Sequence, residues 1–436
     1  MNSLWTDTVN LPEFPASLEN HHADVLIIGG GMAGLLCAYF LQQSGVRCLL
    51  LEAGRIGGGV TGCTTAKLTV QHRLIYHKIA RKYGLDSARL YLEANQQALA
   101  QYRRMCRTID CEFETKESFL YTLGQTDSLE EELDVLQKLG ADVSFCQQLP
   151  LPLKTTGAIC VPHQAQFHPL KFLSHICRGL QIQEHTRVQA FDGRGWITNR
   201  GRFTAKQTII TTHFPICNKH GGYYLKLYQH RSYVLALKNA AAVDGMYLDV
   251  CNAGLSFRNY GDLLLLGGGA HRTGKPGGGW DSLRDFARLH YPQAREEYHW
   301  ATQDCMSLDG IPYIGRYGKH TPQLYVATGF NKWGMTSSMA AALLLRDLVL
   351  GKVNPYAALF SPQRKLDWPQ LMRNGLAAAG NLLTPTRPRC PHLGCALKWN
   401  PQERSWDCPC HGSRFDAVGT LLDNPATGAL HPPSEP

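Results

Sequence analysis

Two short groups of cysteine and histidine near the C-terminal end could bind a metal. They are Cys390-Pro391-His392, with Cys395 shortly after, and Cys408-Pro409-Cys410-His411. Each group offers a thiolate and an imidazole, and two sulfur and two nitrogen ligands suit a pair of irons. A structural zinc ion accepts the same ligand types, but zinc fingers pair Cys with Cys and His with His. The spacing therefore favours an iron–sulfur cluster, with zinc as the alternative.

A glycine-rich group near the N-terminal end could bind a nucleotide. Gly29, Gly31 and Gly34 follow the apolar strand 25–28 in the pattern G-x-G-x-x-G. Such glycines let the backbone approach a pyrophosphate, which then lies at the N-terminus of the next helix. Glu52 ends the second strand, 18 residues beyond Gly34, where a carboxylate can accept hydrogen bonds from a ribose. An ordinary glycine-rich turn is the alternative, but the strand, the helix and Glu52 together favour a dinucleotide.

The hydrophobic pattern predicts the elements that must hold these residues. After the first strand and the glycine turn come a helix at 32–44 and a strand at 46–51, which form a βαβ unit. Helices are expected at about 66–83 and 87–109, and alternating strands between 188 and 266 indicate a second, antiparallel sheet. We therefore expect an α/β fold in which a Rossmann-like βαβ domain contains an inserted antiparallel-sheet substrate domain.

Length and composition agree with this organisation. The 436 residues predict two or three domains, and a hydrophobic share of 44% excludes a disordered or fibrous chain. The net charge is +9, but Lys and Arg are scattered, so we expect no nucleic-acid partner and no membrane span. Eleven of the 15 cysteines are dispersed, and the first residues show no signal-peptide pattern. Both features predict a cytoplasmic protein.

Further segments decide between FAD and NAD. They are a small-residue loop at 59–67 and two segments at 309–315 and 327–336. With them, about residues 22–352 resemble the FAD-dependent amine and amino-acid oxidoreductases of the D-amino-acid oxidase and glycine oxidase superfamily. In that family the last segment begins a helix whose N-terminal dipole faces the flavin and stabilises its anionic reduced form. The resemblance implies FAD, and no second G-x-G-x-x-G indicates an NAD(P)H site.

The glycine loop and the resemblance together assign the FAD contacts. These contacts come from the first loop and its helix, from the end of the second strand, from the small-residue loop, from a backbone contact to the adenine, and from the last segment. The expected contacts are Gly29, Gly31, Met32, Ala33, Gly34, Glu52, Thr61, Thr64, Thr65, Val188, Gly329, Gly334, Met335 and Thr336.

The C-terminal groups resemble both boxes of a respiratory-type Rieske [2Fe–2S] domain. The resemblance implies the cluster ligands Cys390, His392, Cys408 and His411 and a disulfide between Cys395 and Cys410. Asn424-Pro425-Ala426 is similar to the proline loop that covers the cluster, although the family usually has Gly at the place of Asn424. Rieske domains normally have several strands before the first box, whereas a helical linker precedes it here. We therefore expect a small, trimmed all-β module.

These resemblances set the expected domain boundaries. An irregular lead-in occupies 1–22, the FAD-dependent oxidoreductase 23–363, a helical linker 364–384 and the trimmed Rieske module 385–436. Within the oxidoreductase, FAD-binding parts are expected at about 23–85, 155–215 and 305–352, and substrate-domain parts at about 110–150 and 220–300.

Arg258 and His271 are the candidates for the substrate side, because both belong to the inserted strands. The guanidinium of Arg258 could bind a substrate carboxylate as a bidentate fork, and His271 follows a run of glycines. An ordinary surface or core position is the alternative for the histidine.

The leading hypothesis is an FAD- and [2Fe–2S]-dependent dehydrogenase. A small amine or amino acid would give a hydride to the flavin, and electrons would leave singly through the Rieske cluster to an external acceptor. Two alternatives stay open. One is a reductase that runs the same chain from an external donor, and the other is a non-catalytic electron-transfer or redox-sensing protein.

Replacing Gly31 by Val tests the glycine loop. We expect the variant to lose most of its FAD, because a side chain would occupy the space that the pyrophosphate must approach. Glu52→Ala should weaken FAD less, since a charge-assisted ribose contact is worth about 1.5 to 3 kcal/mol. Flavin absorbance per purified chain measures both effects, and full occupancy in Gly31→Val would mean that the loop does not bind the pyrophosphate.

Overall fold

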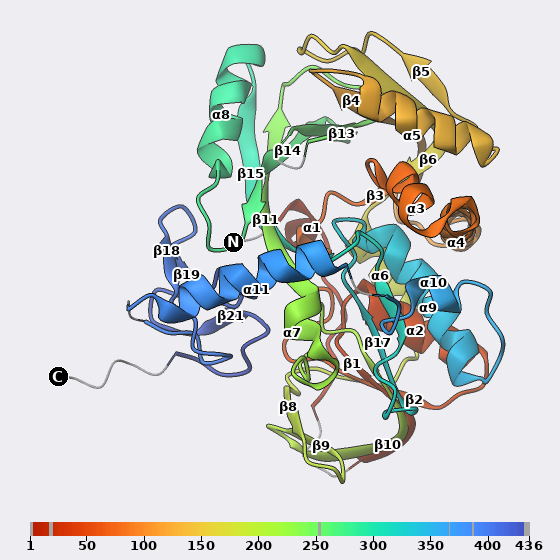
Figure 1. Ribbon diagram of the computed structural model, residues 1–436, viewed down its shortest axis with the longest axis vertical. Helices are drawn as coiled ribbons and strands as arrows, with labels where there is room; N and C mark the ends of the chain where they lie inside the picture. The colour runs from red at the N-terminus through yellow and green to blue at the C-terminus, as the bar shows by residue number, and fades with distance from the viewer. Residues whose placement is uncertain (1–2, 17–20, 252–253, 366, 386–387, 431–436) are drawn as a thin grey trace.

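Two large sheets and one small sheet organise the chain (Figure 1). The computed structural model describes residues 3–16, 21–251, 254–365, 367–385 and 388–430. The first sheet has eight strands, the second nine and the third four. This arrangement confirms the expected α/β fold with a small C-terminal β module.

The first sheet is the Rossmann-like sheet, and its central strands are parallel. Its path runs β16-β17-β10-β1-β2-β7, with β8 and β9 attached beside β10, and only β16 and the β8–β9 pair run antiparallel to their neighbours. The strands are β1 (His21–Ile28), β2 (Cys48–Leu51), β7 (Ile182–Gln183), β8 (Val188–Phe191), β9 (Trp196–Thr198), β10 (Gly201–Ile210), β16 (Tyr313–Arg316) and β17 (Leu324–Thr328).

The second sheet comes from the inserted segments. It is antiparallel except where β12 pairs with β4 in parallel, which differs from a purely antiparallel expectation. Its path is β15-β11-β14-β13-β12-β4-β6-β3, with β5 beside β6. The strands are β3 (Lys67–Leu68), β4 (Glu114–Thr122), β5 (Ser144–Cys146), β6 (Gly157–Gln166), β11 (Leu227–Lys238), β12 (Met246–Asp249), β13 (Ser256–Tyr260), β14 (Leu263–Arg272) and β15 (Arg295–Ser307).

Helices cover both large sheets (Figure 1). The described α-helices are α1 (Leu4–Thr8), α2 (Met32–Gln43), α3 (Ile75–Tyr83), α4 (Leu85–Met105), α5 (Asp127–Lys138), α6 (Pro169–Ile176), α7 (Tyr223–Lys226), α8 (Gly279–His290), α9 (Gly334–Val349), α10 (Ala357–Phe360) and α11 (Trp368–Leu383). Two short 3₁₀ turns, η1 (Val60–Cys63) and η2 (His220–Gly222), complete the set. No helix in these ranges is both long and apolar enough to cross a membrane.

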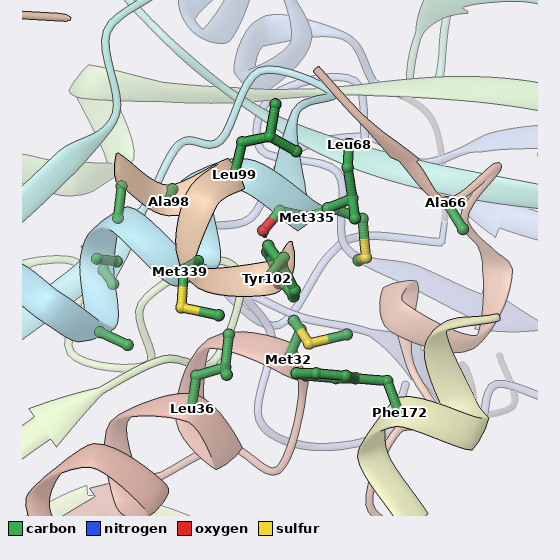
Figure 2. Packing of buried hydrophobic residues seen from close by; sticks show 14 of the residues in the cluster. Met32, Leu36, Ala66, Leu68, Ala98, Leu99, Tyr102, Phe172, Met335 and Met339 are labelled. Atoms are coloured by element: carbon green, nitrogen blue, oxygen red, sulfur yellow. Dashed lines mark hydrogen bonds between the residues drawn. The ribbon is translucent and has the colours of Figure 1, made fainter. Parts of the chain in front are cut away.

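The main core lies where α2, α4 and α9 meet (Figure 2). Met32 and Leu36 of α2 face Met335 and Met339 of α9, and all four side chains are buried. The hydroxyl of Tyr102 in α4 donates to the carbonyl of Met335 at 2.9 Å. This contact matters for the site because it fixes the N-terminal turn of α9.

Two local expectations are wrong. The segment 66–74 is not helical: it forms β3 and an irregular turn, and Ala66 and Arg73 have positive φ angles of 53° and 59°. Helix therefore begins only at Ile75. The lead-in is not wholly irregular either. It contains α1, and Leu4 and Trp5 of this helix are buried in the main core.

The C-terminal module is a four-stranded antiparallel sheet in the order β18-β19-β20-β21. Its strands are β18 (Lys398–Asn400), β19 (Ser405–Asp407), β20 (Arg414–Asp416) and β21 (Leu421–Asp423). Helix α11 leads from the oxidoreductase to this module across the surface (Figure 1). An isolated bridge between Arg389 and Ala396 is the only pairing described before β18 in this module.

Strand β11 holds the module through alternate side chains. Gln229 donates to the carbonyls of His411 and Asn424 at 2.9 and 3.1 Å, and Arg231 forms a two-pronged ion pair with Glu403. Residues two apart on a strand point to the same face, so one face of β11 serves the module. Gln303, opposite Arg231 on β15, adds a bond to the carbonyl of Gly412 at 2.8 Å.

Arg231→Met tests this interface. The arginine and Glu403 are 4% and 6% exposed, so removing the cation should cost about 1.5 to 3 kcal/mol of unfolding free energy. Burial raises the pKa of Glu403, but Arg231 and Arg414 outweigh it and leave the pKa below the usual 4.5. The pair therefore stabilises the fold above about pH 4.5 and loses that contribution as pH falls further.

Denaturant unfolding of the two proteins at several pH values measures the difference. Arg47→Met is the matched control, because Arg47 is 84% exposed in its pair with Asp24 and should cost at most about 1 kcal/mol. Equal losses of unfolding free energy in the two variants would contradict the conclusion that the buried ion pair stabilises the contact between the module and the sheet.

Candidate active site

One cavity of about 640 Å³ lies between the two large sheets and reaches the C-terminal module. Its first end is lined by the glycine loop and by Glu52, and its second end by β11, β14 and β15. Asp423, Asn424 and Ala426 of the module close part of its wall. A single space thus connects the predicted nucleotide loop, the substrate sheet and the loop after β21.

The glycine loop leaves an open cradle at the end of β1. A Cβ on Gly31 would meet only the hydroxyl of Thr61, at 3.2 Å, so the backbone there faces the cavity. At Gly34 a Cβ would lie 1.9 Å from the carbonyl oxygen of Gly29. Gly34 is therefore required for the close approach of α2 to the strand, whereas Gly31 leaves space for a ligand.

Glu52 and Thr61 shape this cradle through the backbone. One carboxylate oxygen of Glu52 accepts from the amide of Gly30 at 2.7 Å and the other from Gly54 at 2.8 Å. The hydroxyl of Thr61 accepts from the amide of Met32 at 3.0 Å, at the first turn of α2. These contacts hold the loop in the form that a pyrophosphate and a ribose require.

Most of the expected FAD contacts line the cavity. The residues found there are Gly29, Gly31, Met32, Ala33, Glu52, Thr61, Thr64, Thr65, Val188, Gly329, Gly334 and Met335. Gly34 and Thr336 are not in the lining. The hydroxyl of Thr336 donates instead to the carbonyl of Thr69 at 3.0 Å, which anchors α9 to the segment after β3.

The two candidates for the substrate side lie outside the lining. The buried guanidinium of Arg258 donates to the carbonyls of Thr65 and Ala66 at 2.8 and 2.9 Å. Arg258 therefore holds the small-residue loop in place and does not line the cavity. This corrects the expectation that it binds a substrate carboxylate. The ring of His271 stacks on Tyr233 with centroids 5.7 Å apart, and its Nδ1 lies 3.1 Å from the carbonyl oxygen of Gly269.

Three other cations line the cavity instead. The pKa of Lys67 is lowered to about 7. Burial is the largest cause, and the neighbouring charges of Arg258 and Arg73 add to it. Burial also lowers the pKa of Arg73 to about 10, and its Nε is buried without a partner among the described residues. Lys332 is the third of them, and Arg73, which stays charged near pH 7, suits the cavity to an anionic group.

Lys332 reaches the cavity from a strained turn. Asn331 and Lys332 have φ angles of 51° and 74°, a backbone conformation that residues other than Gly seldom adopt. The side chain of Asn331 holds the turn by accepting from the amide of Ser307 at 2.8 Å and donating to the carbonyl of Gly310 at 2.9 Å. Strain of this kind persists only where surrounding contacts fix it, often at functional sites.

The ammonium of Lys332 has two polar neighbours. Its Nζ lies 2.7 Å from the hydroxyl of Ser232 and 3.8 Å from a carboxylate oxygen of Asp304. Burial lowers its pKa to about 8, although Asp304 opposes this effect. Sequence reasoning missed Arg73, Lys332 and Asp304 as site residues; for Lys332 the available signal was its place in the segment 327–336, two residues before α9.

The predicted cluster ligands come together in the module. The rings of His392 and His411 lie 5.0 Å apart at 90°, and the Nδ1 atoms of both are buried without partners among the described residues. Burial lowers the pKa of His392 to about 4 and that of His411 to about 3, so both rings are neutral near pH 7. Metal ligation needs neutral imidazoles, and two such nitrogens beside two thiols fit a [2Fe–2S] cluster.

The two cysteine ligands lie side by side. Cys390 and Cys408 are buried free thiols that share a hydrogen bond, and this bond, from Cys408, lowers the pKa of Cys390 to about 7. The amides of His392 and Leu393 donate to the sulfur of Cys390. Those of Cys410 and His411 donate to that of Cys408. Amides aimed at sulfur stabilise the negative charge that a cluster carries.

The loops around the ligands are joined to each other and to the oxidoreductase. A disulfide links Cys395 to Cys410, the pair that the resemblance implied. The side-chain amide of Asn424 donates to the carbonyls of Thr212 and Phe214 at 2.6 and 2.7 Å. These bonds hold the proline loop against the segment that follows β10. Nε2 of His392 lies 2.7 Å from the side-chain oxygen of Asn218, which fixes that ring from outside.

Comparison with known proteins agrees with both halves of this site. The model of the family of FAD dependent oxidoreductases matches residues 24–348, and the Rieske [2Fe-2S] domain model matches residues 377–433. The chain is similar to glycine oxidase from Geobacillus kaustophilus in structure, with a TM-score of 0.68 and 21% identity over 79% of this chain and all of that one. This likeness shows the shared fold.

Two relatives are similar in sequence. YhfW of Bacillus subtilis (strain 168), described as a Rieske 2Fe-2S iron-sulfur protein, is 35% identical over 98% of this chain and 96% of its own length. Gamma-glutamylputrescine oxidoreductase of Escherichia coli (strain K12) is 24% identical over 78% of this chain and 86% of its own. The chain therefore belongs to the family of FAD dependent oxidoreductases and carries a C-terminal Rieske [2Fe-2S] domain.

Proposed function

We propose that this protein oxidises a small amino acid or a related carboxylated amine and passes the electrons through its Rieske centre to an external acceptor. FAD supplies hydride acceptance and the [2Fe–2S] cluster supplies one-electron transfer when they are bound. The residues that would hold FAD are those of the glycine loop, Glu52 and the first turn of α9. Cys390, His392, Cys408 and His411 would hold the cluster.

One observation supports electron transfer between the flavin and the Rieske cluster. Asp423, Asn424 and Ala426, from the loop that follows β21, line the same cavity as the glycine loop. The hydroxyl of Ser413, two residues after a ligand histidine, accepts from the amide of Ala426 at 3.0 Å. The proline loop, which is bonded to Ser413 beside a candidate ligand, thus forms part of the cavity wall, and this supports electron transfer within one chain.

The charges of the cavity support a carboxylated substrate. Arg73 stays charged near pH 7, because its pKa is about 10, and its buried Nε lacks a partner among the described residues. A substrate carboxylate would satisfy this nitrogen. A substrate without a carboxylate would leave it unpaired, so we expect such a substrate to bind more weakly.

Lys332 is suited to hold a proton beside the substrate. An amine must lose its ammonium proton before it can give up a hydride, and a base works best with a pKa near the working pH. With a pKa of about 8 and Ser232 and Asp304 as neighbours, Lys332 can accept that proton. Asp304 then stabilises the charged form that results.

Anaerobic reduction by substrate tests the relay. In the parent protein, the effective amino acid should bleach the flavin and then produce the electron paramagnetic resonance signal of a reduced [2Fe–2S] cluster. Cys408→Ala should lose iron and this signal but keep FAD and flavin bleaching, since Cys408 is a candidate cluster ligand and does not line the cavity. Cys251→Ala, which changes an exposed cysteine, is the control and should behave as the parent does.

Three results would contradict the proposal. Bleached flavin beside a persistently oxidised cluster would remove the relay, and zinc in place of iron would remove the Rieske centre. Bleaching by none of a panel of amino acids, N-substituted amino acids and amines would favour a reductase or a non-catalytic protein.

Lys332→Met tests the proton acceptor. In the parent, the rate of flavin reduction should rise about tenfold per pH unit below pH 8 and level off above it, because deprotonated Lys332 is the active form. In the variant this limb should disappear and the rate should fall about 10² to 10⁴-fold. Stopped-flow measurements with Lys352→Met, an exposed lysine, provide the control. An unchanged pH profile in Lys332→Met would assign the proton to another group.

A further inference from the structure

Helix α11 has its apolar face turned outward. Trp368, Met372, Leu376 and Leu383 are 64%, 59%, 69% and 84% exposed. Their spacing of four, four and seven residues places them on one side of a helix. The inward side carries the buried polar residues Asn374 and Asn381 instead. This pattern reverses the one expected for a helix that packs on a protein surface.

Polar contacts on the inner side fix this orientation. The side-chain oxygen of Asn374 accepts from Arg272 of β14 at 3.1 Å, and its amide donates to the carbonyl of Leu225 at 3.4 Å. The carbonyl of Asn381 accepts from the amide of Ala396 in the module. The outward direction of the apolar residues therefore follows from specific bonds, and turning the helix over would break them.

Exposed cations flank α11. Of the Lys and Arg in residues 364–399, the side chain of Arg364 is buried in an ion pair with Asp309, and the one acidic residue of the segment, Asp367, forms an ion pair with Lys82. Lys365, Arg373 and Arg389 are exposed. These three exposed cations lie at the two ends and on one side of the apolar stripe.

The stripe ends at the cluster. The guanidinium of Arg389 donates to the carbonyl of Leu382 at 3.1 Å and to that of Gly394 at 2.7 Å. These bonds join the last turn of α11 to the loop that carries the ligand His392. A surface that binds this apolar stripe would therefore lie next to the Rieske centre.

We propose that α11 docks this protein on an anionic membrane surface. A helix that places an apolar face into the boundary of headgroups and acyl chains, with basic residues around it, binds such lipids. Sixteen residues give a stripe about 24 Å long, with a Trp at one end, which suits a flat lipid surface. Two copies of this basic face would repel each other, which argues against a second chain as the occupant.

This docking does not depend on the identity of the substrate. It explains why a single helix exposes large apolar side chains close to the point where electrons would leave. The membrane would hold the cluster loop at the lipid surface, and it requires no span of the bilayer.

Vesicle binding by the full-length holoprotein tests the proposal. The probes are vesicles of phosphatidylglycerol and phosphatidylcholine in equal parts, and vesicles of phosphatidylcholine alone. We expect co-sedimentation with the anionic vesicles, less with the neutral ones, and weakening as salt is raised. The double variant Met372→Glu with Leu376→Glu should lower the affinity by about tenfold or more. Arg373→Glu should reduce the preference for anionic lipid.

Val353→Glu is the matched control, since Val353 is apolar and 97% exposed away from α11, and it should bind as the parent does. FAD and iron content, measured in every variant, show that each is folded. Absence of binding to anionic vesicles by the parent would overturn the proposal, and so would a double variant that binds as well as the parent. A fall in particle mass in the double variant without lipid would assign the face to a second copy instead.

Discussion

The alternation of side chains along β11 and β15 is the constraint on which the rest of the structure depends. On one face, Gln229, Arg231 and Gln303 hold the Rieske module through buried hydrogen bonds and an ion pair. On the other face, Ser232 and Asp304 surround Lys332 in the cavity. Because successive residues of a strand point to opposite sides, two adjacent strands serve both redox sites at once.

This shared wall has a consequence for how the two halves act. The module is anchored through a buried ion pair, through the amide of Asn424 and through the contact between His392 and Asn218. Buried charges are costly unless each is paired, so Glu403, with Arg231 and Arg414 on either side, holds the interface in one arrangement. The loop after β21 therefore forms part of the cavity wall, and the oxidoreductase supplies Asn218 as a neighbour of His392.

The chemistry of each half could be predicted from short segments. The G-x-G-x-x-G loop needs only local backbone geometry, and the two Cys-His boxes need only their ligand types and spacing, so both were recognisable without the fold. The substrate end was not. Arg258 had the right side chain for a carboxylate, yet its neighbours turn it toward the carbonyls of Thr65 and Ala66. Arg73 belongs to a segment whose pattern predicted helix, and a positive φ angle instead directs the chain along the cavity.

The sequence by itself determined the α/β class, the FAD-binding half and the existence of a C-terminal Rieske module, because these are encoded in contiguous residues. Only the tertiary structure decided which basic side chains line the cavity, that Asn331 holds Lys332 in a strained turn, and that the module rests on β11. It also decided that α11 turns Leu376 outward and Asn374 inward. The reason is physical: these features arise from contacts between residues far apart in the chain, from Asn331 with Ser307, 24 positions apart, to Arg231 with Glu403, 172 positions apart. No local pattern records such contacts.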